Sequence, residues 1–70
     1  MINYKYKKEQ VKVEGRIHNT YSILCYKGNE LIQKITDAFA TKEAANSFVE
    51  MCNRYMLEPI HLLNVLDDYL

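Results

Sequence analysis

The side chains that could carry out chemistry are two cysteines, Cys25 and Cys52, and two histidines, His18 and His61. Cys52, Asn53 and His61 are residue types that form nucleophilic sites when a thiol and an imidazole lie together. Helical spacing, however, predicts Cys52 on a buried stripe and His61 on the polar side of its own helix. No glycine-rich turn lies nearby to supply an oxyanion hole. We therefore predict that the protein is not an enzyme.

The same cysteines and histidines do not form a metal-binding pattern, because no pair shows C-x-x-C or H-x-x-x-H spacing. A lone cysteine in a core behaves as a small apolar residue, so we expect free thiols, no metal and no cofactor. The segment Met1 to Lys5 lacks the apolar stretch of a secretory leader, and no apolar run is long enough to cross a membrane. These features predict a cytoplasmic protein that does not use a membrane.

Basic and acidic residues are unevenly divided along a chain of zero formal net charge. Residues 1–29 contain six lysines and arginines and two acids, a balance of +4, whereas residues 30–70 contain three and seven, a balance of −4. Such a split can steer a partner, or it can pair the basic half of one copy with the acidic half of another.

Tyrosines and lysines alternate from Tyr4 to Lys8, a pattern that could bind nucleic acid by stacking rings on bases and pairing ammonium groups with phosphates. Successive side chains of a strand point to opposite faces, so the tyrosines would lie apart from Lys5 and Lys7. Lysines on an edge strand also prevent pairing with another chain. A solvated edge is the favoured interpretation, and nucleic-acid binding by the basic half is the alternative function.

Residues 1–36 have the pattern of a three-stranded antiparallel meander. Strands are predicted over 3–13, 17–26 and 30–36, with a positive φ at the glycine of each turn. The apolar positions of the first strand change parity, which predicts a bulge near residues 8–10. A three-residue loop, Glu14 to Arg16, would set Val13 opposite Ile17. In the second strand, the more apolar face predicts a core set of Ile17, Tyr21, Ile23 and Cys25.

Two helices follow, over 41–57 and 59–70. Thr41 is a good N-cap, and Pro59 both ends the first helix and suits the first position of the second. Apolar residues at helical spacing form one stripe on each helix. The stripe of the first helix is Ala44, Ala45, Phe48, Val49, Cys52, Tyr55 and Met56. The stripe of the second helix is Leu62, Leu63, Val65, Leu66, Tyr69 and Leu70. We predict one α+β domain over residues 1–70, in which an antiparallel helical hairpin covers one face of the meander.

The C-terminal half contains three recognisable motifs: Cys52-Asn53, the segment Leu57 to Leu62 (LEPIHL) and the segment Val65 to Leu70 (VLDDYL). Two shorter motifs lie upstream, Tyr21-Ser22-Ile23 and the segment Thr41 to Ala45. Over nearly the whole chain, this set resembles a family of very small Gram-positive bacterial proteins of unknown function. The family pattern has serine where this chain has Glu58, which replaces a good N-cap by a weaker one. The resemblance implies a single-domain bacterial protein of the cytosol, and it implies no activity.

We predict a small non-enzymatic module that binds itself, as a homodimer, or another protein. Two surfaces are candidates: the uncovered face of the meander, with Leu24, Tyr26 and Ile32, and the acidic end of the last helix, with Asp67, Asp68, Tyr69 and Leu70. The first has more apolar surface than a two-layer domain can cover. In the second surface, the carboxylates lie at the C-terminal end of a helix, where they oppose the helix dipole. The favoured interpretation is a last turn that frays in solvent, and the functional alternative is a surface that binds a basic partner.

Overall fold

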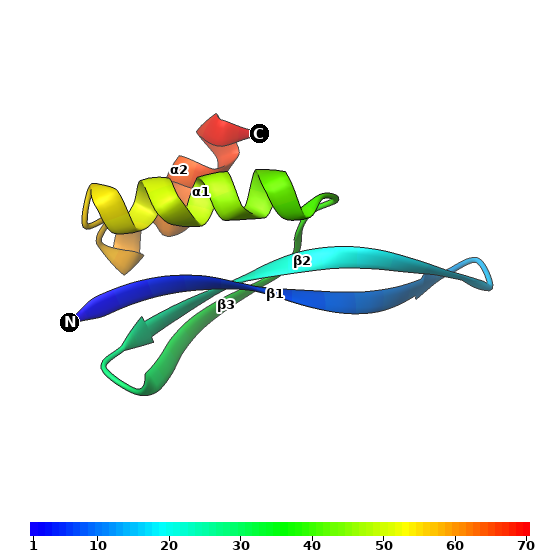
Figure 1. Ribbon diagram of the computed structural model, residues 1–70, viewed down its shortest axis with the longest axis horizontal. Helices are drawn as coiled ribbons and strands as arrows, with labels where there is room; N and C mark the ends of the chain where they lie inside the picture. The colour runs from blue at the N-terminus through cyan, green and yellow to red at the C-terminus, as the bar shows by residue number, and fades with distance from the viewer.

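The computed structural model describes residues 1–70. Three strands are followed by two helices: β1 (Ile2–Val13), β2 (Arg16–Lys27), β3 (Glu30–Phe39), α1 (Lys42–Arg54), a 3₁₀ turn η1 (Pro59–His61) and α2 (Leu62–Tyr69). The strands form one antiparallel sheet in the order β1-β2-β3, and the helices pack on one of its faces (Figure 1). The predicted α+β arrangement of a meander and two helices is confirmed.

The core lies between the sheet and the helices, and both layers contribute to it. Its buried members are Tyr4, Ile23, Cys25, Phe39, Ala45, Phe48, Val49, Cys52, Leu62 and Leu66. Thr41 caps α1 as expected, since its hydroxyl accepts a hydrogen bond from the amide of Ala44 at 3.2 Å. The buried residues of α1 (Ala45, Phe48, Val49 and Cys52) pack against the strands, so the apolar stripe of this helix faces the sheet.

The β1–β2 hairpin differs from its predicted register. β1 pairs with β2 without a break from Ile2 to Val13, so the predicted bulge is absent from β1. Val13 pairs with Arg16 across a two-residue turn, in which Glu14 and Gly15 both have positive φ, the geometry that suits a twisted hairpin. The outer half of this hairpin extends beyond the helices (Figure 1). Neither of its faces is covered by a helix, so its apolar side chains need not stay on the face that carries the core residues nearer the helices. For the same reason Ile17 is 67% exposed, and its predicted core position is wrong.

The irregularities of the sheet lie instead between β2 and β3. Tyr21 pairs with Phe39 and Ile23 with Ile35, so three residues of β3 lie opposite Ser22 alone. Asp37, in the middle of these three, has a φ of 52°. The bulge lets β3 continue to Phe39, three residues past its predicted end, before the chain turns into α1.

The first helix ends earlier than predicted, at Arg54 rather than at residue 57. Met56 has a φ of 50°, and the amides of Met56 and Leu57 donate to the carbonyls of Asn53 and Cys52. This is the Schellman arrangement, which stops a helix. Tyr55 and Met56 are consequently 71% and 83% exposed and do not join the buried stripe.

The predicted break at Pro59 is present. Pro59 opens the 3₁₀ turn η1, and α-helical geometry begins at Leu62, three residues after the predicted start of the second helix. Glu58 makes no side-chain capping bond, which agrees with the weaker cap expected at this position.

Candidate protein-interaction surfaces

The uncovered face of the sheet is less apolar than the sequence predicts. Leu24 lies on this face but is only 9% exposed, so its predicted availability to a partner is wrong. The ammonium group of Lys5 lies over the Tyr26 ring, 5.5 Å from its centre, so the lysine side chain covers part of that ring. Ile32 is 42% exposed and the neighbouring Leu31 46%. Long side chains of the flanking strands thus shield the central strand.

The acidic end of α2 is only partly a free surface. The Tyr69 ring packs edge-on against Phe39 and Phe48, with centroid separations of 5.9 and 5.2 Å, and the residue remains 41% exposed, so one side of the ring contacts the core. Asp67 and Asp68 are exposed, as both the solvated last turn and the binding of a basic partner require.

A second apolar stripe runs along η1 and α2 on the side away from the core. Its members are Ile60, Leu63 and Leu70, which are 79%, 56% and 74% exposed. Together with Asp67, they follow helical spacing, and we call these four residues the outer face of α2. Leu62 and Leu66 fill the buried side of the same helix. The sequence signal was present, since the apolar stripe of this helix is too wide to be buried on one side.

The most distinctive surface is the outer half of the β1–β2 hairpin, residues 8–20, which we call the arm. β3 pairs with β2 only from Tyr21 onward, so the arm is a two-stranded ribbon that projects from the body (Figure 1). Val13 and Ile17 are 52% and 67% exposed on it. It also carries three exposed cations, listed as Lys8, Lys12 and Arg16. The arm was not predicted, although a signal for it is present: the third predicted strand, 30–36, is too short to pair with the whole of 17–26.

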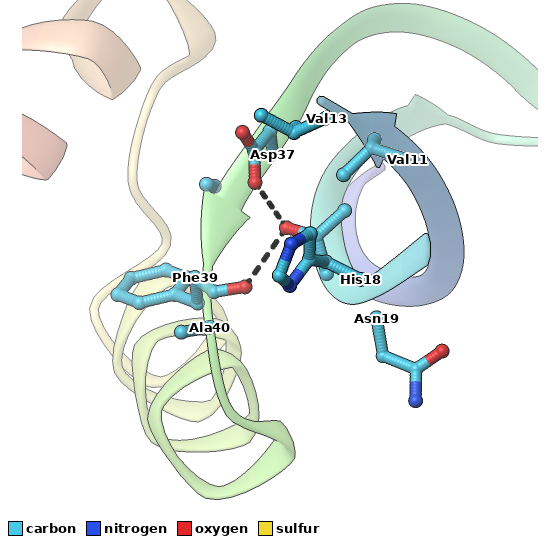
Figure 2. A pocket seen from close by; sticks show the side chains of 9 residues that line it. Val11, Val13, His18, Asn19, Asp37, Phe39 and Ala40 are labelled. Carbon is cyan, nitrogen blue, oxygen red and sulfur yellow. Dashed lines mark hydrogen bonds between the residues drawn. The ribbon is translucent and has the colours of Figure 1, made fainter. Parts of the chain in front are cut away.

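An open hollow of about 530 Å³ lies at the base of the arm, beside the end of β3. Figure 2 shows Val11, Val13 and His18 of the arm on one side of it, with Phe39 and Ala40 on the other. Most of its lining is apolar, and it is open to solvent. The hollow is therefore suited to an apolar side chain of a partner rather than to an enclosed small molecule.

A polar network lies where the arm leaves the body. The Ser22 hydroxyl donates to the Glu9 carboxylate, which also pairs with the Lys34 ammonium group at 2.9 Å. The hydroxyl of Thr20 donates to the carboxylate of Asp37 (Figure 2). The Ser22 hydroxyl and then Lys34 lower the pKa of Glu9 below its ordinary value. Contacts of this kind join all three strands where the ribbon begins.

The thiols are separated from the imidazoles. Cys25 and Cys52 are free and buried, whereas His18 and His61 are exposed. Burial raises the pKa of Cys52 from 9.0 to about 11, and it also raises that of Cys25. No three His, Cys, Asp or Glu side chains gather where they could hold a metal ion. Neither buried thiol is hydrogen-bonded to one of the exposed imidazoles.

Comparison with known proteins assigns no relatives. No protein-family model, curated protein or solved structure matches this chain. None of its helices has the length and apolar character needed to pass through a bilayer.

Proposed function

We propose that the protein is a small non-enzymatic interaction module that binds protein and associates with itself. The arm is the observation that carries this proposal. Two-stranded ribbons are marginally stable in water, and this one exposes Val13 and Ile17 beyond the reach of the helices. An association that covers the arm would remove this apolar surface from water.

The buried thiols support the non-enzymatic part of the proposal. A nucleophilic cysteine needs an accessible thiolate, and burial opposes both access and ionisation at Cys52. Free thiols are also consistent with the cytoplasmic location that we propose. Membership of the small Gram-positive family stays a prediction.

Sedimentation equilibrium over a wide range of protein concentrations tests self-association. We expect the apparent mass to rise from the 8.3 kDa of one chain toward twice that value. A mass that stays at that of one chain at the highest concentration would refute self-association.

Nucleic-acid binding is the second candidate, favoured by the exposed cations of the arm. Tyr4 is 2% exposed beneath the helices and Tyr6 packs against the core, so neither ring is free to stack on a base. Any binding would then depend on phosphates. Retention on a polynucleotide column that falls steeply with added salt would favour this function over protein binding.

A further inference from the structure

We propose that the arm of one copy docks on the outer face of α2 of a second copy, and that the second arm docks on the first copy in return. This inference rests on the proposed self-association and names the surfaces that carry it. It gives a closed dimer with two identical contacts related by a twofold axis.

The two surfaces match in apolar character. The arm offers Val11 and Val13 around the hollow at its base, and the outer face of α2 offers Leu63 and Leu70 as projecting side chains. The hollow is open to solvent and the side chains of the outer face of α2 are exposed, so an apolar side chain of α2 can enter the hollow. Removing both from water supplies the driving force.

The two surfaces also match in charge. Glu9 is already paired with Lys34, so Glu14 is the one acid of the arm left against its three cations. Arg16 pairs with Val13 and therefore shares the face of the arm that borders the hollow. Lys8 and Lys12 lie on the opposite face of the ribbon and add to the positive charge of the arm as a whole. The segment Pro59 to Leu70 has two acids, Asp67 and Asp68, and no lysine or arginine. Pairing arm with arm would bring cations together, and pairing α2 with α2 would bring acids together. Of these three pairings, only the crossed one places opposite charges face to face.

The contact has to form between two copies. Ile60, Leu63 and Leu70 on the outer face of α2 are exposed, and the arm projects away from α2 in Figure 1, so the two surfaces of one chain do not cover each other. A stable interface buries about 600–1,000 Å² on each partner, which is roughly an eighth to a fifth of the 5168 Å² surface of one copy. Two reciprocal contacts per dimer share this requirement, so each needs to cover only about half of it.

Charge reversal provides the test. One variant combines Lys12→Glu with Arg16→Glu, and a second combines Asp67→Lys with Asp68→Lys. All four side chains are exposed, and circular dichroism verifies that each variant folds. The control for the first variant, Lys27→Glu with Lys42→Glu, makes the same change in charge away from the arm. Association is measured by sedimentation at low salt, for each variant alone and for an equimolar mixture.

We expect each reversed variant alone to associate at least tenfold more weakly than the unchanged chain, and the control to associate normally. In the mixture both contacts regain opposite charges, so we expect heterodimers of two copies. If the unchanged chain dimerises but the reversals have no effect, or if the mixture stays monomeric or grows beyond two copies, this arrangement is wrong while self-association stands. An unchanged chain that never dimerises overturns both proposals.

Discussion

The side-chain amide of Asn53 takes the place of a neighbouring strand at the outer edge of β1. Its Oδ1 accepts from the amide of Tyr4 at 2.8 Å, and its Nδ2 donates to the Tyr4 carbonyl at 3.0 Å. The Tyr4 hydroxyl in turn donates to the carbonyl of Leu57 at 2.7 Å. These bonds tie the first strand to the end of α1. The Cys52-Asn53 motif and Leu57 thus have a structural explanation that involves no catalysis.

We expect Asn53→Asp to destabilise the fold by about 1–3 kcal/mol, because it removes the donor to the Tyr4 carbonyl and turns an acceptor toward that oxygen. The midpoint of urea unfolding measures the effect. Asn46→Asp is the matched control, since this exposed amide on the same helix bonds only to Glu50, and we expect a loss of a few tenths of a kcal/mol, on the order of an exposed helix pair. Equal losses for the two variants would contradict the role given to Asn53.

The thiols give a prediction with a defined dependence on pH. At pH 8, a pKa of about 11 in place of 9.0 leaves Cys52 with about a hundredfold less thiolate, and burial limits access further. We expect iodoacetamide to modify the native protein slowly and the urea-unfolded protein at the rate of a free thiol. Mass spectrometry at timed intervals follows the reaction, and rapid modification of the native Cys52 would contradict the buried site.

The same shift predicts how stability changes in alkali. The pKa of Cys52 is higher in the folded state than in the unfolded state, so the unfolded chain loses its thiol proton first as pH rises. The contribution of the buried neutral thiol to the free energy of unfolding is therefore complete below pH 9.0 and is lost as pH rises toward about 11. We expect the urea midpoint to fall across this interval, and to fall less in Cys52→Ala. An identical slope in the variant would show that other groups account for the loss.

At the scale of elements, the end of α1 is set by a residue that sequence rules do not favour. Met56 occupies a left-handed conformation that usually selects glycine, and its side chain is 83% exposed. The apolar periodicity continues through Tyr55 and Met56, so the pattern predicted a longer helix. Local backbone geometry overrode periodicity here.

We expect Met56→Gly to stabilise the protein by about 0.5–1 kcal/mol, because it relieves a left-handed conformation and removes no buried contact. Thermal unfolding measures the gain as a rise in Tm of a few degrees, about 2–8 °C for a domain of this size. Ser47→Gly, at an exposed position inside the same helix, should instead cost about 0.5 kcal/mol. A loss of stability in Met56→Gly would show that the exposed methionine makes a contact of its own.

Much of the fold could be predicted from the sequence because its signals are local. The order of elements, the cap at Thr41, the positive φ of both turn glycines and the break at Pro59 each follow from residue type and spacing. The bulge predicted in the first strand lies instead between β2 and β3. The alternation of apolar residues along a strand does not show which of them the helices cover. Only the tertiary arrangement shows that Ile17 lies on a projecting arm and that neighbouring strands shield Leu24.

At the scale of the whole molecule, the uneven charge of the chain becomes a spatial separation. The cations of the arm lie on one projection, and Asp67 and Asp68 lie on α2 on the other side of the sheet–helix interface. Salt should weaken an association of these two surfaces, because the pairs are exposed and screened. Apolar contacts at the hollow should preserve part of the affinity.

Paramagnetic NMR tests the central claim directly, that the arm of one copy lies on α2 of the other. A nitroxide is attached to the exposed Asn64→Cys position of an unlabelled copy, while the buried native thiols stay unmodified, and this copy is mixed with ¹⁵N-labelled protein. We predict broadening of the amide signals of residues 11–18 in the labelled copy. Broadening confined to another surface, or none at concentrations where the dimer is populated, would contradict the arrangement.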